Sequence, residues 1–169
     1  MANKIHHPFN SIFSWYIKKR IHQIDLFRKY PSEVQQETLL KLLSKAKNTA
    51  VGRKYDFNSI SSIGEFKNRV PIQEYKDIEP TINQLKKGVQ NLTWPTEIKW
   101  FAKSSGTTTG NSKFIPVSRE SLADCHYKGG KDLLALYYNN FPKTKLFKGK
   151  HLILGGSSQL NYFNKDSYF

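Results

Sequence analysis

The hydrophobic period of this chain changes near residue 98, and the change limits the folds open to it. Before that point, apolar residues recur at intervals of three and four, as in amphipathic helices. Within "TEIKWFAK" the period becomes two, with Ile98, Trp100 and Ala102 on one face, which predicts a strand. "KFIPVS" resumes as a second short strand, in which Pro116 indicates an edge or a strand end.

These patterns predict an α/β fold. The 169 residues are enough for one domain with a real core. We expect residues 1–92 to be a mainly helical lead-in and residues 93–169 to be a strand–loop–strand–helix–strand unit. The last of these strands is predicted in "KHLILGG", a short apolar run bounded by glycines.

Two kinds of signal predict helices in the lead-in. Residues 11–31 carry an apolar stripe, which places Lys18, Lys19 and Arg20 on the surface and ends before Pro31. Elsewhere the signal is the spacing of a capping box, in which a serine and a glutamine or glutamate three residues later satisfy free backbone N–H groups. This spacing occurs at Ser32 with Gln35 and at Ser62 with Glu65.

Proline and glycine positions shape the remaining helical predictions. "IQEYKDIEPTINQLKKG" predicts two short helices separated at Pro80, which lacks a backbone N–H. A further helix is predicted from a Ser118 cap, and Gly129 and Gly130 inside it indicate close packing. Its predicted buried face consists of Leu122, Cys125, Leu133, Leu136 and Tyr137.

The formal net charge is +14, which raises the possibility of a nucleic-acid or anionic-membrane partner. The basic residues are mostly lysines scattered along the chain, which favours solvated surfaces instead. No apolar run is long enough to cross a bilayer, and no signal peptide is apparent. Cys125 has no second cysteine to pair with, so we expect a reduced, cytoplasmic location. The histidines and Cys125 lack metal-ligand spacing, and no metal site is predicted.

The loop between the two predicted strands, "KSSGTTTGNSK", holds more hydrogen-bonding groups than a turn needs. Glycines let backbone N–H groups approach a phosphate, hydroxyls add donors with little bulk, and lysine adds charge. The residues that supply these groups are Ser104, Ser105, Gly106, Thr107, Thr108, Thr109, Gly110 and Lys113. From composition alone, a flexible Ser/Thr-rich hairpin loop without a ligand stays an equal alternative.

Two common phosphate-binding motifs do not describe this loop. The P-loop pattern G-x-x-x-x-G-K-[ST] fails, because Gly106, Gly110 and Lys113 have a different spacing and Phe114 follows the lysine. A strand is also expected next, where a P-loop needs a helix. The dinucleotide fingerprint G-x-G-x-x-G is absent as well.

"SSGTTTGNSK" resembles the phosphate-binding loop of adenylate-forming enzymes, whose commoner form reads T-S-G-T-T-G-x-P-K. The loop is one residue longer here, at Thr109, and has Ser112 where proline is common. In this it is similar to the acyl-acid amido synthetases of the auxin-responsive promoter family, which has bacterial members. A T-x-x-G-R turn beginning at Thr49 and an F-x-x-x-V-P-I-x-x-Y stretch ending at Tyr75 extend the resemblance.

The resemblance implies that the chain is an N-terminal fragment of a bacterial-type member. It would hold part of the large domain, with the C-terminal domain absent, and would be inactive alone. The implied reaction is ATP-dependent: a carboxylic acid is adenylated, then joined to an amino acid. The loop hydroxyls, the two loop glycines and Lys113 would bind the phosphates of ATP, with Mg²⁺ as a cofactor. Tyr127, Lys128 and Asp132 are candidates for contact with the acid substrate.

Two alternatives stay open at this point. Within the same chemistry, an acyl-CoA ligase would use a similar loop, although the extra residue argues against it. Outside that chemistry, the chain could be a small basic binding module for nucleic acid or acidic surfaces. On the leading interpretation the partners are a carboxylic acid and an amino acid, with neither nucleic acid nor membrane expected.

Overall fold

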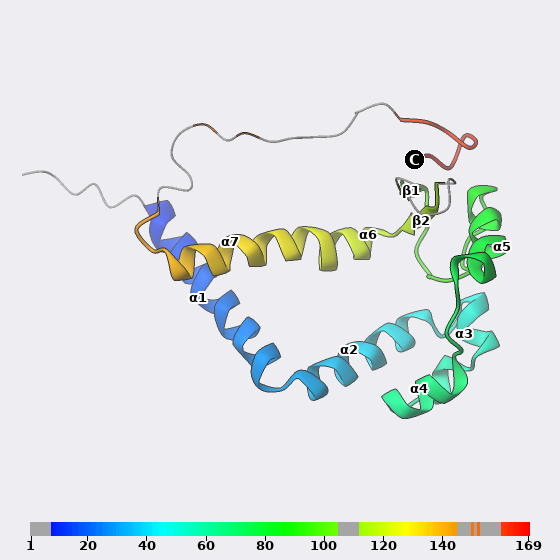
Figure 1. Ribbon diagram of the computed structural model, residues 1–169, viewed down its shortest axis with the longest axis horizontal. Helices are drawn as coiled ribbons and strands as arrows, with labels where there is room; N and C mark the ends of the chain where they lie inside the picture. The colour runs from blue at the N-terminus through cyan, green and yellow to red at the C-terminus, as the bar shows by residue number, and fades with distance from the viewer. Residues whose placement is uncertain (1–7, 105–111, 145–149, 151, 153–159) are drawn as a thin grey trace, which may run out of the picture. The chain divides into compact units, whose positions relative to one another are not determined.

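The computed structural model describes residues 8–104, 112–144, 150, 152 and 160–169. The chain divides into two compact units, Met1–Val34 with Asp124–Gly155 and Gln35–Ala123 with Gly156–Phe169. Figure 1 shows the order of the elements along the chain. The described residues are mostly helical, with one small two-stranded sheet, so the α/β expectation holds only in this reduced form.

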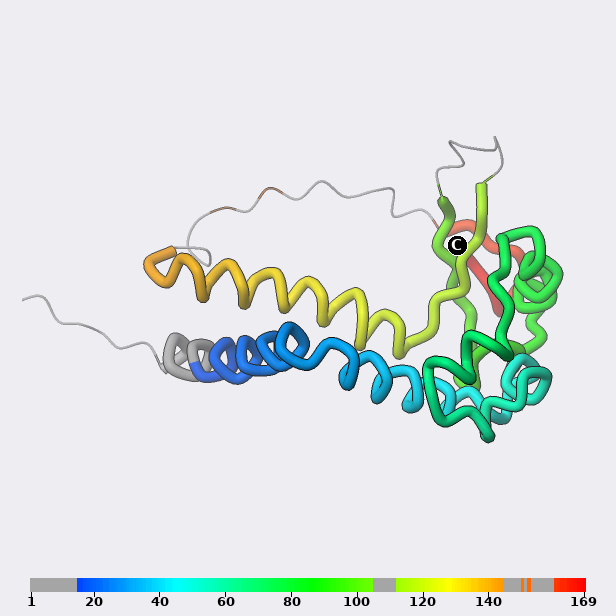
Figure 2. The backbone as a smooth tube through the Cα atoms, turned by 60° about the horizontal axis from the view of Figure 1, so that its bottom comes forward, coloured from blue at the N-terminus to red at the C-terminus, as the bar shows by residue number. Residues whose placement is uncertain are grey.

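In the first unit, helices α1 (Pro8–Lys29) and α7 (Lys128–Asn140) lie side by side and run in opposite directions (Figure 2). Arg20 of α1 forms a bidentate ion pair with Asp132 of α7. Arg20 Nε donates to Asp132 Oδ1, and Nη2 donates to Oδ2 at 2.6 Å. Arg20 Nη1 donates to Gln23 Oε1 at 2.7 Å. The surface position predicted for Arg20 is therefore wrong. Its guanidinium is buried because neighbouring side chains satisfy its donors.

The predicted buried face of the helix after Ser118 is also wrong. The helix begins as α6 (Arg119–Ser121), passes through a π-helical turn at Leu122–Tyr127 and continues as α7. Among its described residues Ala135 is fully buried, whereas the five residues predicted to be buried are exposed or, at Leu122, half-buried. A Cβ added at Gly129 or Gly130 would meet nothing within 4 Å, so no close packing of described residues explains these glycines.

The second unit contains helix α2 (Pro31–Ala46) from Gln35 on, then α3 (Ala50–Lys54), a 3₁₀ turn at Phe57–Ser59 and α4 (Ile63–Arg69). The T-x-x-G-R segment joins α2 to α3. Thr49 Oγ1 donates to the Ala46 carbonyl at 2.7 Å and accepts from the Gly52 N–H at 2.9 Å. A Cβ at Gly52 would lie 2.1 Å from the Ala46 carbonyl oxygen. The junction therefore admits only glycine at that position.

The capping predictions have different outcomes. Ser62 caps α4, with its Oγ accepting from the Glu65 N–H at 3.1 Å. The Glu65 carboxylate accepts from the Ser61 N–H at 2.7 Å, and this bond lowers its pKa. The Ser32 box is wrong, because α2 already begins at Pro31, a residue suited to the first helical position.

Helix α5 (Tyr75–Lys86) continues through Pro80, so the predicted break is wrong. A proline inside a helix costs about 3 kcal/mol. Ile82 and Leu85, just beyond it, are buried in the main core, and burying each such side chain contributes about 1.5–3 kcal/mol. Tertiary packing therefore outweighs the local penalty.

The two predicted strands, β1 (Trp100–Lys103) and β2 (Phe114–Val117), are confirmed and pair antiparallel, with Trp100 opposite Val117. The C-terminal segment pairs with β1, where the Phe101 N–H donates to the Tyr168 carbonyl at 2.9 Å. Phe101 is fully buried, in a core with Ile82, Leu85 and Ile98. The strand predicted in "KHLILGG" falls mainly on residues outside the described ranges.

We predict that Asp132→Asn weakens the α1–α7 pair by about 2–3 kcal/mol, somewhat less than the loss of a fully buried partner would cost. The hydrogen bonds from Arg20 lower the pKa of Asp132, so the pair stabilises the unit above the ordinary pKa of aspartate. That stability is lost as the pH falls through the lowered pKa. Faster amide hydrogen exchange in α1 and α7 would measure the loss.

Asp25→Asn is the matched control for this change. Asp25 also pairs with an arginine, Arg28, at 3.3 Å, but both side chains are exposed, and such surface pairs contribute little. Equal exchange rates in the Asp25 and Asp132 variants would contradict the importance of the Arg20–Asp132 pair.

Candidate functional site

The base of the predicted phosphate loop is closed by two hydrogen bonds between its first and last residues. The Ser104 N–H donates to the Lys113 carbonyl at 2.9 Å, and the Lys113 N–H donates to Ser104 Oγ at 2.9 Å. Residues 105–111, which hold the other predicted phosphate ligands from Ser105 to Gly110, lie outside the described ranges. Their assignment stays a prediction.

The bond to Lys113 uses Ser104 as an acceptor and leaves its donor available. A serine hydroxyl has one O–H donor and two acceptor lone pairs. Ser104 Oγ accepts from the Lys113 N–H, and its own hydrogen has no acceptor among the residues that the structure describes. A role for this donor toward a phosphate stays a prediction.

Three lysines of the described chain lie over aromatic rings near the last residue pair of the hairpin, in which Lys103 is opposite Phe114. Lys103 Nζ lies 5.2 Å from the Phe169 ring centroid, and Lys86 Nζ lies 4.1 Å from that of Phe114. Lys113 Nζ lies 5.4 Å from the Tyr75 ring centroid. Burial lowers the pKa of Lys86. These contacts gather positive charge at the end of the hairpin that carries the loop.

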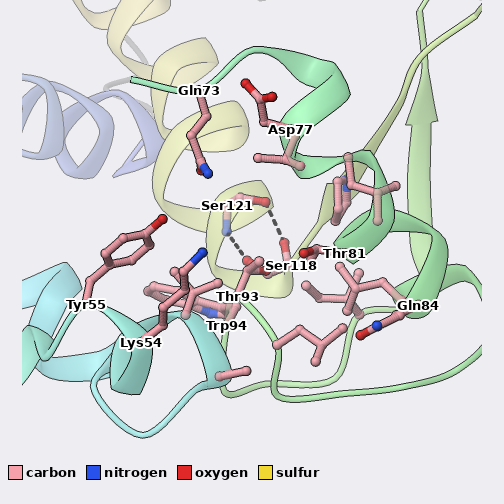
Figure 3. Close-up of a pocket in the computed structure, with 18 residues that line it drawn as sticks. Lys54, Tyr55, Gln73, Asp77, Thr81, Gln84, Thr93, Trp94, Ser118 and Ser121 are labelled. Atoms are coloured by element: carbon pink, nitrogen blue, oxygen red, sulfur yellow. Dashed lines mark hydrogen bonds between the residues drawn. The ribbon is translucent and has the colours of Figure 1, made fainter. Parts of the chain in front are cut away.

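A cavity of about 540 Å³ lies at the other end of β2 (Figure 3). Its walls come from α3, α5, residues 92–98 and the residues that follow β2. Figure 3 shows Ser118 and Ser121 hydrogen-bonded to each other in the wall, where Ser118 Oγ accepts from the Ser121 N–H at 3.1 Å. This bond confirms the predicted Ser118 cap. None of the predicted site residues lines the cavity, and no pattern in the sequence pointed to it.

Beside this cavity, Glu120 fixes the segment that precedes β1. Its Oε2 accepts from Trp94 Nε1 at 3.1 Å and from Thr96 Oγ1 at 2.8 Å. Burial opposes ionisation of Glu120, but these hydrogen bonds outweigh it and lower the pKa. An ionised carboxylate therefore ties residues 94–96 to α6.

The three candidate substrate residues lie on the helical run of the first unit. Tyr127 and Lys128 are exposed, and the Tyr127 ring contacts His126 with centroids 5.4 Å apart. Both carboxylate oxygens of Asp132 accept from Arg20. The structure thus gives Asp132 a partner within the helix pair, and a substrate role for these residues stays a prediction.

The profile of the GH3 family N-terminal domain matches residues 20–167. The chain belongs to this family. The family description agrees with the resemblance of the loop and of the segments before it, and the match includes both strands of the hairpin.

Several curated plant enzymes are similar to this GH3 chain. Jasmonoyl–L-amino acid synthetase JAR4 of Nicotiana attenuata is 32% identical over 103 residues, which is 60% of this chain and 18% of that protein. JAR6 of the same plant is 27% identical over 163 residues, covering 89% and 28%. Indole-3-acetic acid-amido synthetase GH3.5 of Arabidopsis thaliana is 30% identical over 106 residues, covering 62% and 17%. The chain therefore matches less than a third of each relative.

Solved structures share the fold. A GH3.15 acyl acid amido synthetase superposes with a TM-score of 0.76 at 24% identity, covering 90% of this chain and 27% of that one. The AtGH3.15 enzyme in complex with 2,4-DB gives a TM-score of 0.73 at 23% identity, with the same coverage.

The donor set at the loop base suits a phosphate but not a protein-held metal ion. It consists of ammonium, hydroxyl and backbone N–H groups, whereas Mg²⁺ needs oxygen ligands such as carboxylates. In the described part of the chain, no three acidic, histidine or cysteine side chains gather at one point. Mg²⁺ as a cofactor therefore stays a prediction from the sequence. No described helix is both long and apolar enough to cross a membrane.

We predict that Ser104→Ala speeds hydrogen exchange at the Lys113 amide by about fivefold to tenfold, because one hydrogen bond of about 1 kcal/mol is lost. The second bond, from the Ser104 N–H, would remain. NMR-detected exchange measures this change. Ser112→Ala, a neighbouring hydroxyl deletion, serves as the control, and an equal effect there would contradict the closure of the loop base by Ser104.

Proposed function

We propose that this chain is the N-terminal part of an ATP-dependent acyl-acid amido synthetase. The observation that carries the proposal is the closed loop base between β1 and β2, where the Ser104 hydroxyl donates to no described residue and Lys113 supplies charge. Membership of the GH3 family supports it. The chain would act with ATP on a carboxylic acid and an amino acid.

The proposed reaction has two steps. A carboxylate oxygen attacks the α-phosphorus of ATP, and the bond to the pyrophosphate breaks, leaving an acyl-adenylate. The amine of an amino acid then attacks the acyl carbon, AMP departs with the bonding electrons, and the amine loses a proton. Negative charge grows on the departing pyrophosphate in the first step. Fixed hydrogen-bond donors and a lysine ammonium stabilise that charge without rearranging.

Two features favour an amino acid over coenzyme A as the acceptor. The loop has the extra residue Thr109, which resembles the amido synthetase branch. The similar plant enzymes are described as acid–amino acid synthetases. The bacterial-type assignment and a cytoplasmic location stay predictions from the sequence.

We predict that Ser105→Ala or Thr107→Ala slows adenylation by about 10- to 100-fold, the effect of losing one hydrogen bond to a charged group. The test is ATP–pyrophosphate exchange by the protein expressed from the complete reading frame, screened against a panel of carboxylic acids. Ser44→Ala is the control, because Ser44 is exposed on α2.

Exchange that depends on an added acid would establish adenylation and identify the acid. Amide formation with amino acids, but no thioester with coenzyme A, would then identify the acceptor class. A folded protein with no exchange for any acid would contradict the proposal and favour the basic binding module. Unchanged exchange in both loop variants would contradict the roles of Ser105 and Thr107.

A further inference from the structure

We infer that Tyr75 is a positioning residue for Lys113, the last residue of the predicted phosphate loop. It lies outside the loop, on α5, and acts on Lys113 and Phe114, the residues at which the loop rejoins β2. The inference rests on the proposed function, because it assigns Tyr75 a role in ATP binding through Lys113.

The first line of evidence is the Tyr75 hydroxyl, which satisfies both backbone groups of Phe114. The Phe114 N–H donates to Tyr75 Oη at 3.0 Å, and the Tyr75 hydroxyl donates to the Phe114 carbonyl at 3.4 Å. These groups belong to the edge of β2 that faces away from β1. The hydroxyl thus takes the place of a neighbouring strand at the residue where the loop ends.

The second line of evidence is the Tyr75 ring, which lies under the Lys113 ammonium. The distance from Nζ to the ring centroid is 5.4 Å, within the range of a cation–π contact. Lys113 is also held through its backbone by Ser104. The lysine is therefore fixed at both its main chain and its charged end.

The third line of evidence is the support beneath Tyr75. Tyr75 is the first residue of α5, and the Glu74 N–H donates to Asp77 Oδ2 at 2.8 Å, which fixes that end of the helix. Further along, Ile82 and Leu85 anchor the helix in the core. Tyr75 is thus placed by the core of the unit and can fix the position of Lys113 and Phe114.

Removing the Tyr75 hydroxyl should therefore affect the nucleotide more than the acid. In the protein expressed from the complete reading frame, we expect Tyr75→Phe, which removes both hydrogen bonds to Phe114, to raise the KM for ATP by about tenfold. The KM for the acid should stay within about twofold. Tyr75→Leu, which also removes the ring, should raise the KM for ATP further.

Tyr30→Phe is the matched control. Tyr30 also lies under a lysine, with Lys29 Nζ 5.3 Å from its ring centroid, but its hydroxyl has no hydrogen bond to another described residue. A double-mutant cycle with Lys113→Met tests whether Tyr75 acts through the lysine. In the Lys113→Met background, Tyr75→Phe should change the KM for ATP by less than about twofold.

The outcomes separate this inference from the proposed function. Absence of acid-dependent pyrophosphate exchange in the wild-type protein would contradict the function itself. Given such exchange, a Tyr75→Phe variant with a lower melting temperature but a wild-type KM for ATP would show a structural role alone and overturn the inference. A full tenfold effect that persists in the Lys113→Met background would overturn it too. A selective rise in the KM for ATP that vanishes with Lys113 would support it.

Discussion

Burial of Phe101 holds together the part of the molecule that carries the loop. Strands of four residues in a two-stranded sheet are marginal in water. Phe101 supplies the missing stability by packing between α5 and aromatic side chains of the C-terminal segment, and its ring meets that of Phe163 edge-to-face at 5.6 Å. The same core anchors α5, which carries Tyr75. The base of the loop and the helix that supports it therefore depend on the same hydrophobic core.

Local signals in the sequence were sufficient to predict the strands and two of the caps. A period of two predicted β1, and the serines at 62 and 118 lie where their hydroxyls can reach free N–H groups. The errors arose where distant residues decide the outcome. Helix α5 continues through Pro80 because the core holds its far end. Arg20 is buried because it pairs with Asp132, a residue 112 positions away in the sequence.

The candidate site follows the same division. The residue types of the loop were compatible with a phosphate site, the resemblance to adenylate-forming enzymes favoured one, and the assignment stays a prediction. Tyr75 was visible in the sequence only as the end of a V-P-I-x-x-Y stretch, since its contact with Phe114 spans 39 positions. The cavity at the other end of β2 could not be predicted from a local sequence pattern, because its walls come from four separate segments.

The junction between α2 and α3 has a consequence for how this domain can vary. Gly52 touches the end of α2 so closely that any side chain would collide with main-chain atoms, which cannot move aside as a flexible side chain could. Its neighbours Ala50 and Val51 line the cavity and are only half-buried. Other side chains could therefore replace those of the cavity lining at little steric cost, whereas a side chain at position 52 would displace the backbone that holds the lining in place.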